Sequence, residues 1–435
     1  MWNEPVQTMP REQLRALQTE RLRSQVATLH RRVPFYSQRL SDAGVTPASV
    51  TTLEDLARLP FTSKLDMREV FPFGLFASDP VDIVEVHMSS GTTGKPVVGA
   101  YTRADLALWG EVMARTLDAG GAGPGDIVQN AYGYGLFTGG VGVHYGGTTL
   151  GAMVLPMSSG NSFRQLSTLQ DFGTTVLTCT PSYALFLAEY ASEHGVDLPA
   201  APLRAGFFGA EPWSEGMRAD IEARLGIKAY DIYGLTEVIG PGVGGECQFQ
   251  DGLHIFEDHF YPEIIDPDTG AVLPAGERGE LVLTTLTRQG TPVLRYRTRD
   301  ITYLMDEPCP CGRTSRRIHR LMGRNDDMLI IRGVNVFPQQ VEEVLLRVEG
   351  VEPHYRLIVD REHSMDSLEV EVEMAEALFS DEVRVVLALE RRVEHELRVT
   401  LGIQTTVRLV NPKSIARSEG KANRIVDRRS VTTSV

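Results

Sequence analysis

One short run of the chain has residue types suited to holding phosphate. The run SSGTTGKP spans residues 89–96 and follows the apolar stretch VDIVEVHM. Consecutive small residues allow several backbone N–H groups and hydroxyls to converge on phosphate oxygens, and Lys95 adds a positive charge. The run therefore predicts a phosphate-binding loop. A flexible surface loop is the alternative, because serine and glycine runs of any order are common there.

This run does not fit the phosphate-binding pattern of the P-loop nucleotide hydrolases. That pattern, GxxxxGK[ST], requires glycine at the position of Ser89 and serine or threonine at the position of Pro96. A proline after the lysine also removes the hydroxyl that would bind magnesium. The GxSxG nucleophile elbow and the HExxH metal motif are absent from the sequence as well, which argues against the hydrolases that use them.

Two further turns follow predicted strands and end in polar residues. FFGAEPW covers residues 207–213, and YDIYGLTE covers residues 230–237. Open α/β sheets bind ligands beyond the carboxyl ends of their strands, so both turns are expected to line one crevice. Glu237 has the carboxylate chemistry that suits Mg²⁺, and Asp300 in YRTRD can accept hydrogen bonds from ribose hydroxyls. Either carboxylate taken alone is equally typical of a helix cap or of the surface.

A glycine-rich segment over residues 131–140 carries three aromatic side chains, Tyr132, Tyr134 and Phe137. These rings could wall a narrow slot in which a small arylacetic acid buries its ring and leaves its carboxylate facing the nucleotide. Ordinary packing of the three rings in the core is the alternative.

The cysteines raise the possibility of a metal site. Cys309 and Cys311 form a compact Cys-Pro-Cys-Gly pair, and Cys247 lies shortly before His254. Three cysteines and one histidine make a tetrahedral structural zinc set. Because Cys-x-Cys is tighter than the usual Cys-x-x-Cys, reduced thiols without a metal are the alternative. Cys179 lies in an apolar run and is predicted to belong to the core.

The elements that must position these residues can be predicted from hydrophobic periodicity. Residues 11–31 have the spacing of an amphipathic helix. Between about residues 83 and 233, β-rich runs alternate with helical stretches such as 182–195 and 214–226, which is typical of βαβ units and a mainly parallel sheet. The predicted strands of this part cover residues 126–129, 152–156, 174–179, 205–210 and 228–234.

After residue 234 the pattern changes to strands and turns without long helices, which predicts a β-rich subdomain. A mixed α and β segment then follows a hinge near Asp326. The predicted architecture is therefore α/β, with a large N-terminal domain over residues 1–325 that holds layered α/β subdomains and a β-rich subdomain. A small, mobile α+β domain over residues 326–435 is expected to close over it.

Composition limits the classes of partner. The 435 residues contain 43 Lys and Arg against 57 Asp and Glu, a net charge of −14, which argues against nucleic acid as a partner. No apolar run reaches the roughly 18 to 20 residues of a membrane-spanning helix, and the N-terminus has no apolar signal core. Only four cysteines occur, which is consistent with a reducing compartment. A cytoplasmic location is expected, and a homodimer is one candidate assembly.

Taken in order, SSGTTGKP, GAEP, YGLTE, YRTRD, GRNDDMLIIRG and SEGKANR resemble the motifs of the adenylate-forming acyl-CoA synthetase superfamily, in particular its phenylacetate-CoA ligase branch. The similarity extends over nearly the whole chain. Two positions depart from the wider superfamily and look normal for this branch. Ile330 stands where many members carry a lysine, and Arg299 stands where Thr-Gly-Asp has glycine.

The resemblance implies roles for individual residues. The residues implied to bind ATP are Ser90, Gly91, Thr92, Thr93, Gly94, Lys95, Gly209, Ala210, Glu211, Asp231, Ile232, Tyr233, Thr236, Asp300 and Arg324. Those implied to line the acid pocket are Tyr132, Tyr134, Phe137, Gly209, Ile232 and Pro241. Lys421 is implied to be the catalytic lysine, Glu237 the Mg²⁺ ligand and Asp326 the hinge.

The implied reaction joins a small aryl acid to coenzyme A at the expense of ATP, with Mg²⁺ as cofactor. The acid first forms an acyl-AMP and pyrophosphate, and the CoA thiol then displaces AMP. One alternative is an adenylation enzyme that loads a carrier-protein thiol. Another is a nucleotide-binding regulator without activity, against which the intact Lys421, Glu237 and phosphate loop argue.

Overall fold

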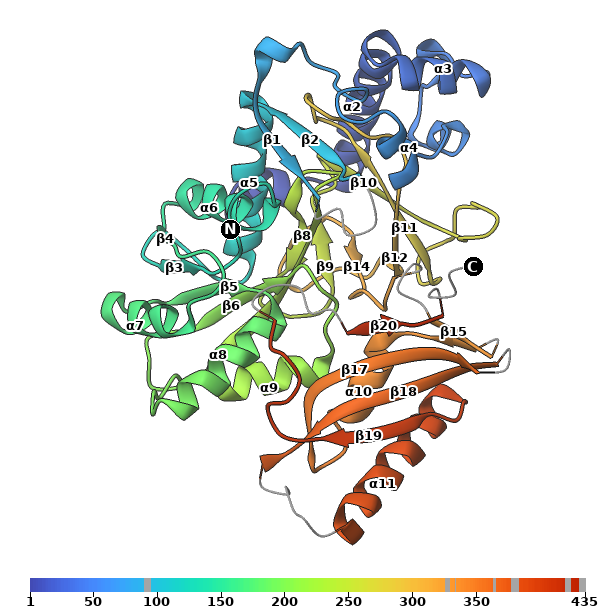
Figure 1. Cartoon of the computed structure of the whole chain (residues 1–435). Helices are drawn as coiled ribbons and strands as arrows, with labels where there is room; N and C mark the ends of the chain where they lie inside the picture. Colours follow the sequence, from blue (N-terminus) through green and yellow to red (C-terminus); the bar gives the residue numbers. More distant parts are fainter. Residues whose placement is uncertain are drawn as a thin grey trace.

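The structure is a computed structural model that describes residues 1–89, 95–324, 329–332, 334–362, 365–376, 383–418 and 424–429. It confirms the α/β fold class with a large N-terminal unit and a small C-terminal α+β unit, the latter lying below the former in Figure 1. The predicted boundary at residues 325–326 and the predicted hinge Asp326 lie outside the described residues. Among the described helices, none has both the length and the apolar character needed to cross a bilayer.

The described helices and strands have the following bounds. The helices are α1 (Glu4–Gln7), α2 (Arg11–Arg32), α3 (Pro34–Asp42), α4 (Lys64–Glu69), α5 (Arg103–Ala119), α6 (Thr138–Leu150), α7 (Ser162–Phe172), α8 (Pro181–Glu193), α9 (Glu215–Leu225), α10 (Pro338–Leu345) and α11 (Val383–Leu401). The strands are β1 (Ile83–Met88), β2 (Val98–Thr102), β3 (Ile127–Asn130), β4 (Met153–Pro156), β5 (Val176–Cys179), β6 (Ala205–Gly209), β7 (Lys228–Leu235), β8 (Gly240–Glu246), β9 (Leu253–Ile255), β10 (Phe260–Ile265), β11 (Gly279–Thr285), β12 (Tyr296–Thr302), β13 (Leu304–Met305), β14 (Arg317–Ile318), β15 (Leu329–Ile331), β16 (Val334–Val336), β17 (Val351–Glu362), β18 (Met365–Met374), β19 (Thr406–Val410) and β20 (Ile425–Asp427).

The largest sheet of the described chain has the order β13-β14-β9-β8-β7-β6-β5-β3-β4. Strands β4, β3, β5, β6 and β7 run parallel, which confirms the predicted βαβ part. From β7 onward the neighbours are antiparallel, so part of the predicted β-rich segment extends this sheet. The remaining strands of that segment, β10, β11 and β12, form a separate antiparallel sheet.

The two faces of the parallel strands are buried under different helices. Along β6, Phe207 packs in the cluster that includes Trp109 of α5, whereas Phe208 packs in the cluster that includes Tyr183 of α8. Neighbouring residues of a strand point to opposite faces, so an uninterrupted apolar run is required here. Figure 1 shows α5 and α6 on one side of the strands and α8 and α9 on the other.

Helix α6 is not predicted by the sequence pattern, because its glycines disfavour an isolated helix. The glycines allow α6 to pack closely on α5. A Cβ at Gly146 would lie 2.3 Å from Cβ of Met113, and a Cβ at Gly142 would lie 2.7 Å from the Trp109 ring. Tertiary packing therefore decides this helix.

The small C-terminal unit has its own core. Its sheet has the order β19-β18-β17-β20, and Val370, Leu357 and Val393 lie in a separate hydrophobic cluster. The unit rests against α8 and α9 through polar contacts. Glu189 of α8 pairs with His354 at 2.5 Å and with Arg417 at 3.2 Å, and Arg224 of α9 lies 3.6 Å from Glu352. These contacts fix the present arrangement of the two units.

Candidate active site

A cavity of about 410 Å³ opens beyond the carboxyl ends of the parallel strands, where ligands are expected in an open α/β sheet. Many of the residues named from the sequence line it. These are Tyr132, Phe137, Ala210, Glu211, Asp231, Ile232, Tyr233, Thr236, Glu237, Asp300 and Arg324. The fold thus brings together side chains that are separated by up to almost two hundred positions in the chain.

One part of the cavity is built by the turns that follow β6 and β7. Ala210 has a positive φ of 70°, which turns the chain directly after β6. Glu211 is almost fully buried, and its Oε1 accepts a hydrogen bond of 2.8 Å from the backbone N–H of Ser182. Burial and the nearby Glu246 carboxylate raise the pKa of Asp231 to about 7. This part therefore places two carboxyl groups where they can form hydrogen bonds to a ligand.

Asp300 is held at a fixed place beside the cavity. The hydroxyl of Tyr233 donates a hydrogen bond of 2.6 Å to its Oδ2, and Nε of Arg324 lies 3.7 Å from its Oδ1. Asp300 and Arg324 also form a β-bridge, which ties the end of the described N-terminal unit to β12. Burial and the Asp300 carboxylate raise the pKa of Tyr233, so this hydroxyl keeps its proton for donation.

Glu237 also lines the cavity and is 7% exposed. Its Oε1 is 3.3 Å from the Nζ of Lys64, the first residue of α4. Both side chains line the cavity, so the ammonium neutralises the carboxylate where a cation or a phosphate could also bind. The neighbouring Thr236 hydroxyl lies 3.3 Å from that of Thr138.

Lys64 is a cavity residue that the sequence reasoning missed. It lies in Ser63-Lys64-Leu65-Asp66, which has the spacing of a capping box. The structure contains that box, with the N–H of Asp66 donating to Oγ of Ser63 at 3.2 Å. This signal predicts where the helix begins, but no local pattern reveals that its first residue faces Glu237. Trp213, Tyr296 and Leu321 also line the cavity without having been singled out.

The expected aromatic slot is present only in part. Tyr132 and Phe137 line the cavity, but Tyr134 does not belong to the lining. The Tyr134 hydroxyl instead accepts a hydrogen bond of 2.8 Å from Asn130 and lies 3.2 Å from His144, and burial raises its pKa to about 12. Tyr134 therefore stabilises the glycine-rich segment through Asn130 and His144 and does not form a wall of the cavity.

Gly209 and Pro241 are likewise absent from the described lining. A Cβ at Gly209 would lie 2.4 Å from the carbonyl oxygen of Ile232, so glycine is needed for the close approach of β6 and β7. The expectation that Gly209 leaves room for a substrate ring stays a prediction, and the close approach gives a separate backbone reason for this glycine. The carbonyl of Pro241 accepts a hydrogen bond of 2.8 Å from Trp109 and serves the core.

Several expected residues cannot be placed. Ser90, Gly91, Thr92, Thr93 and Gly94 lie outside the described residues, as does Lys421. Two flanking residues of the predicted phosphate loop are described. Ser89 lines the cavity, and the Nζ of Lys95 lies 5.8 Å from the centre of the Phe71 ring on an exposed part of the chain.

The four residues of the expected metal set come together at a second place. The ligand atoms of Cys247, His254, Cys309 and Cys311 all lie within 4.8 Å of one another. None of the four lines the described cavity. Cys179, by contrast, is fully buried in the cluster under α8 and α9, as expected for a core residue.

Comparison with known proteins places this fold among adenylate-forming enzymes. The family described as AMP-binding enzyme matches residues 12–286, and the AMP-binding enzyme C-terminal domain matches residues 333–429. A phenylacetate-coenzyme A ligase from Thermus thermophilus is 49% identical over 99% of this chain and 100% of its own length.

Solved structures add information on the arrangement of the two units. A crystal structure of 2-hydroxyisobutyryl-CoA ligase in the postadenylation state, in complex with R3-HIB-AMP, is 31% identical and superimposes with a TM-score of 0.93. The structure of the same ligase with 2-HIB-AMP and CoA in the thioesterification state superimposes with a TM-score of only 0.73, at 32% identity. Both alignments cover 98% of this chain and 92% of the other. Both comparisons use the same ligase and differ in the state of that ligase. The higher TM-score therefore indicates that the two units of the present chain are arranged as in the postadenylation state.

Proposed function

Because the chain belongs to the AMP-binding enzyme family, we propose that it is a ligase that activates phenylacetate as phenylacetyl-AMP and transfers the acyl group to coenzyme A. The observation that carries the proposal is the 49% identity to a phenylacetate-coenzyme A ligase over both full lengths. The cavity supports it, because one wall is aromatic and the remainder carries groups suited to a nucleotide.

The aryl acid is assigned to the wall formed by Tyr132 and Phe137. Tyr132 is 4% exposed and Phe137 is 40% exposed, so a ring bound between them would be removed from water on both faces. The carboxylate of the acid would then point toward Lys64 and the nucleotide. A methylene between ring and carboxylate sets how far the carboxylate reaches, which favours phenylacetate over benzoate.

The nucleotide is assigned to the remaining walls. The turn at Ala210 and Glu211 and the β7 residues Asp231 to Tyr233 frame the base, and Asp300 accepts hydrogen bonds from the ribose hydroxyls beside Arg324. Asp300 is suited to this because Tyr233 and Arg324 already fix its orientation, so little order is lost on binding. The phosphates would extend toward Ser89 and the loop that follows it.

The residues present fit the Mg²⁺ that such a reaction uses. Glu237 supplies one buried carboxylate, and Mg²⁺ in proteins typically takes one or two carboxylates and completes its shell with water and phosphate oxygens. When bound, the ion supplies neutralisation of phosphate charge. Lys64 forms an ion pair with Glu237 in the described arrangement. When the ion binds, the Lys64 ammonium would pair with a phosphate or acid oxygen instead.

The acid oxygen attacks the α-phosphorus of ATP, the bond to the bridging oxygen of pyrophosphate breaks, and phenylacetyl-AMP remains. The thiol of CoA then gives up its proton, its sulfur attacks the acyl carbon, and AMP leaves. The chain contributes mainly positioning and positive charge, with Lys421 assigned to the first step. The small unit is proposed to rotate about Asp326 between the two steps, as the two TM-scores for one related ligase suggest.

The proposal is tested with a panel of acids, namely phenylacetate, hydroxyphenylacetates, indoleacetate, benzoate and a medium-chain fatty acid. We expect acid-dependent exchange between ATP and pyrophosphate, and a kcat/KM for phenylacetate about tenfold or more above that for benzoate or the fatty acid. A fatty acid with the highest kcat/KM would refute the aryl pocket. Exchange without any acid dependence would instead support the inactive regulator.

The acceptor is tested separately. Free CoA should yield the thioester, and failure with CoA together with loading of a carrier-protein thiol would support the alternative adenylation enzyme. Two other expectations stay predictions from the sequence, namely a cytoplasmic location and a homodimeric assembly. Light scattering of the purified chain at several concentrations would check the assembly.

A further inference from the structure

The cluster of Cys247, His254, Cys309 and Cys311 has the dimensions of a tetrahedral metal site. Sγ of Cys247 lies 3.6 Å from Sγ of Cys309, and Sγ of Cys311 lies 3.4 Å from Nε2 of His254. Ligands bound to zinc at about 2.3 Å for sulfur and about 2.0 to 2.1 Å for nitrogen are separated by about 3.8 Å and about 3.6 Å at tetrahedral angles. The two sulfurs are also much farther apart than the roughly 2.05 Å of a disulfide.

The local structure aims the four ligand atoms at one point. Cys309 and Cys311 are joined by a tight turn in which the N–H of Gly312 donates to the carbonyl of Cys309 at 3.1 Å, with a φ of +83° at Gly312. Cys247 directly follows β8, and His254 lies on β9, which pairs with β14 through Arg317. The two halves of the site are therefore already held together by the sheet.

His254 is oriented from outside the cluster. Its Nδ1 lies 3.3 Å from Oγ of Ser315, which leaves Nε2 facing Cys311. An outer hydrogen bond of this kind on the second ring nitrogen is typical of a histidine that binds a metal. Cys247 and His254 are 1% exposed and Cys309 is 7% exposed, whereas Cys311 is partly exposed, so three of the four ligands are buried.

We propose that these four residues bind one zinc ion with a structural role, and that this ion fastens the N-terminal segment, residues 1–11, to the body of the protein. Binding exchanges three thiol protons, which pass to solvent, for one Zn²⁺. Three thiolates with one imidazole select zinc over the hard cations, and ligand atoms within 4.8 Å of one another surround a single ion. The site is independent of the reaction proposed above, since none of its ligands lines the cavity.

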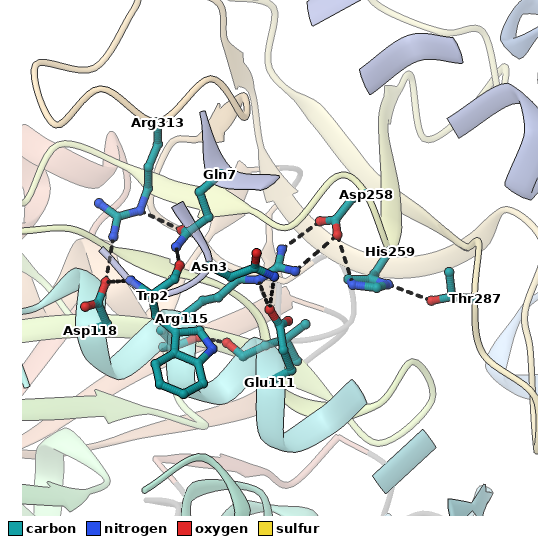
Figure 2. Close-up of polar contacts among 12 residues, drawn as sticks. Trp2, Asn3, Gln7, Glu111, Arg115, Asp118, Asp258, His259, Thr287 and Arg313 are labelled. Atoms are coloured by element: carbon teal, nitrogen blue, oxygen red, sulfur yellow. Dashed lines mark hydrogen bonds and ion pairs between the residues drawn. The ribbon is translucent and has the colours of Figure 1, made fainter. Parts of the chain in front are cut away.

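The link to the N-terminal segment is made by the residues directly after Cys311. Nε of Arg313 donates to Oε1 of Gln7 at 2.7 Å, and the backbone N–H of Thr314 donates to the carbonyl of Gln7 at 2.9 Å. Figure 2 shows how Arg313 also reaches Asp118 at the end of α5, which in turn accepts the backbone N–H of Trp2 at 2.9 Å. A metal that orders the turn at Cys309 and Cys311 therefore also orders Arg313 and Thr314, which bind the N-terminal segment.

The first experiment uses the wild-type full chain, purified without chelators. Elemental analysis should find about one zinc per chain. Titration of the native protein with a mercurial reagent should release that zinc as the thiols are modified. Protein produced with Co²⁺ in place of zinc should show the visible absorption bands of tetrahedral cobalt bound to thiolate. Folded protein without metal, or a disulfide between Cys247 and Cys309, would overturn the proposal.

The second experiment tests the assignment of ligands and of the role. Cys309→Ser should lose the zinc and the cobalt bands, whereas Cys179→Ala, which removes a buried cysteine far from the site, should keep both. In Cys309→Ser, amide exchange in residues 1–11 should be about tenfold faster or more, while turnover per folded molecule changes little. Unchanged metal content in Cys309→Ser, or unchanged exchange after complete loss of metal, would contradict the proposal. Should this variant fail to fold, the wild-type titration still decides the presence of the site.

Discussion

At the scale of single residues, the carboxylates of the cavity already have hydrogen-bond or ion-pair partners within the protein before a ligand binds. Lys64 faces the buried carboxylate of Glu237 at 3.3 Å, and Tyr233 and Arg324 hold Asp300. A preorganised group loses little freedom on binding and stabilises developing charge without rearrangement. The sequence motif contained Glu237 and Asp300, but their partners come from distant parts of the chain.

Lys64 provides a test of this organisation. We expect Lys64→Met to slow acid-dependent exchange between ATP and pyrophosphate about 10- to 100-fold, because an ammonium beside the reacting oxygens is removed. Lys64→Arg keeps the charge and should retain a larger share of the rate. Lys228→Met is the control, since Lys228 pairs with Glu222 on the exposed surface. Exchange at the wild-type rate in Lys64→Met would show that Lys64 serves only the fold.

At the scale of elements, helix α5 is anchored by a buried charge network that joins it to the segment before β10. Arg115 of α5 donates to Asp258 with both terminal nitrogens, at 2.8 Å and 3.2 Å, and donates from Nε to Glu111 at 2.8 Å. His259 lies 2.9 Å from Asp258, and its other ring nitrogen lies 2.8 Å from the Thr287 hydroxyl. Figure 2 shows Arg115 and His259 both reaching Asp258.

Asp258 makes the anchoring of α5 sensitive to acid. Burial by itself would raise the pKa of Asp258, but His259 and Arg115 outweigh it and hold the pKa well below its usual range. Since the folded-state pKa is lower than the unfolded-state pKa, the stabilisation is fully present above about pH 4 and is lost as pH falls below that value. The free energy of unfolding should therefore decrease as the pH falls below about 4.

We expect Asp258→Asn to lower the free energy of unfolding by about 3 kcal/mol at pH 7, because it leaves the charge of Arg115 buried without its main partner. The difference from wild type should shrink as the pH is lowered below about 4, and thermal unfolding at several pH values measures it. The control is Glu54→Gln, which removes an exposed ion pair with Arg15 and should change stability by less than about 1 kcal/mol. A constant difference between Asp258→Asn and wild type at all pH values would contradict this reasoning.

At the scale of the whole molecule, the small unit is held against α8 and α9 mainly by polar contacts, beside an apolar contact of Leu346 with the hydrophobic cluster of these helices. Its cluster around Val370 is separate from that around Tyr183. Glu189 binds both His354 and Arg417, and these two partners outweigh burial and lower the pKa of Glu189. Polar interfaces of this type are compatible with domain rotation.

Domain rotation leads to a prediction for Lys421. If the lysine acts only in the adenylation arrangement, Lys421→Ala should abolish formation of phenylacetyl-AMP, leave thermal stability within about 0.5 kcal/mol, and largely preserve thioester formation from supplied phenylacetyl-AMP and CoA. Arg361→Ala is the control in the same unit, since Arg361 is exposed and pairs with Asp366 of that unit. Equal loss of both half-reactions would count against alternation, and normal adenylation would refute the role of Lys421.

The sequence by itself determined the α/β class, part of the order of elements and the residue types of the candidate site. The alternation of apolar runs predicted β5, β6 and β7 and helices α8 and α9, because local periodicity follows from which faces of an element are buried. The residues Asp231, Glu237 and Asp300, which line the cavity, could likewise be named from the resemblance of their motifs, since a motif is readable without the fold.

Only the tertiary structure decided which residues meet. Helix α6 forms because its glycines allow contact with α5, and Gly209 is needed for the close approach of its neighbour strand. Lys64 contacts Glu237, although the two are separated along the sequence by more than half the length of the N-terminal unit. Cys247, His254 and the pair at 309 and 311 converge because β9 pairs with β14. Such contacts depend on the packing of segments far apart in the chain, and no local pattern of residue types contains that information.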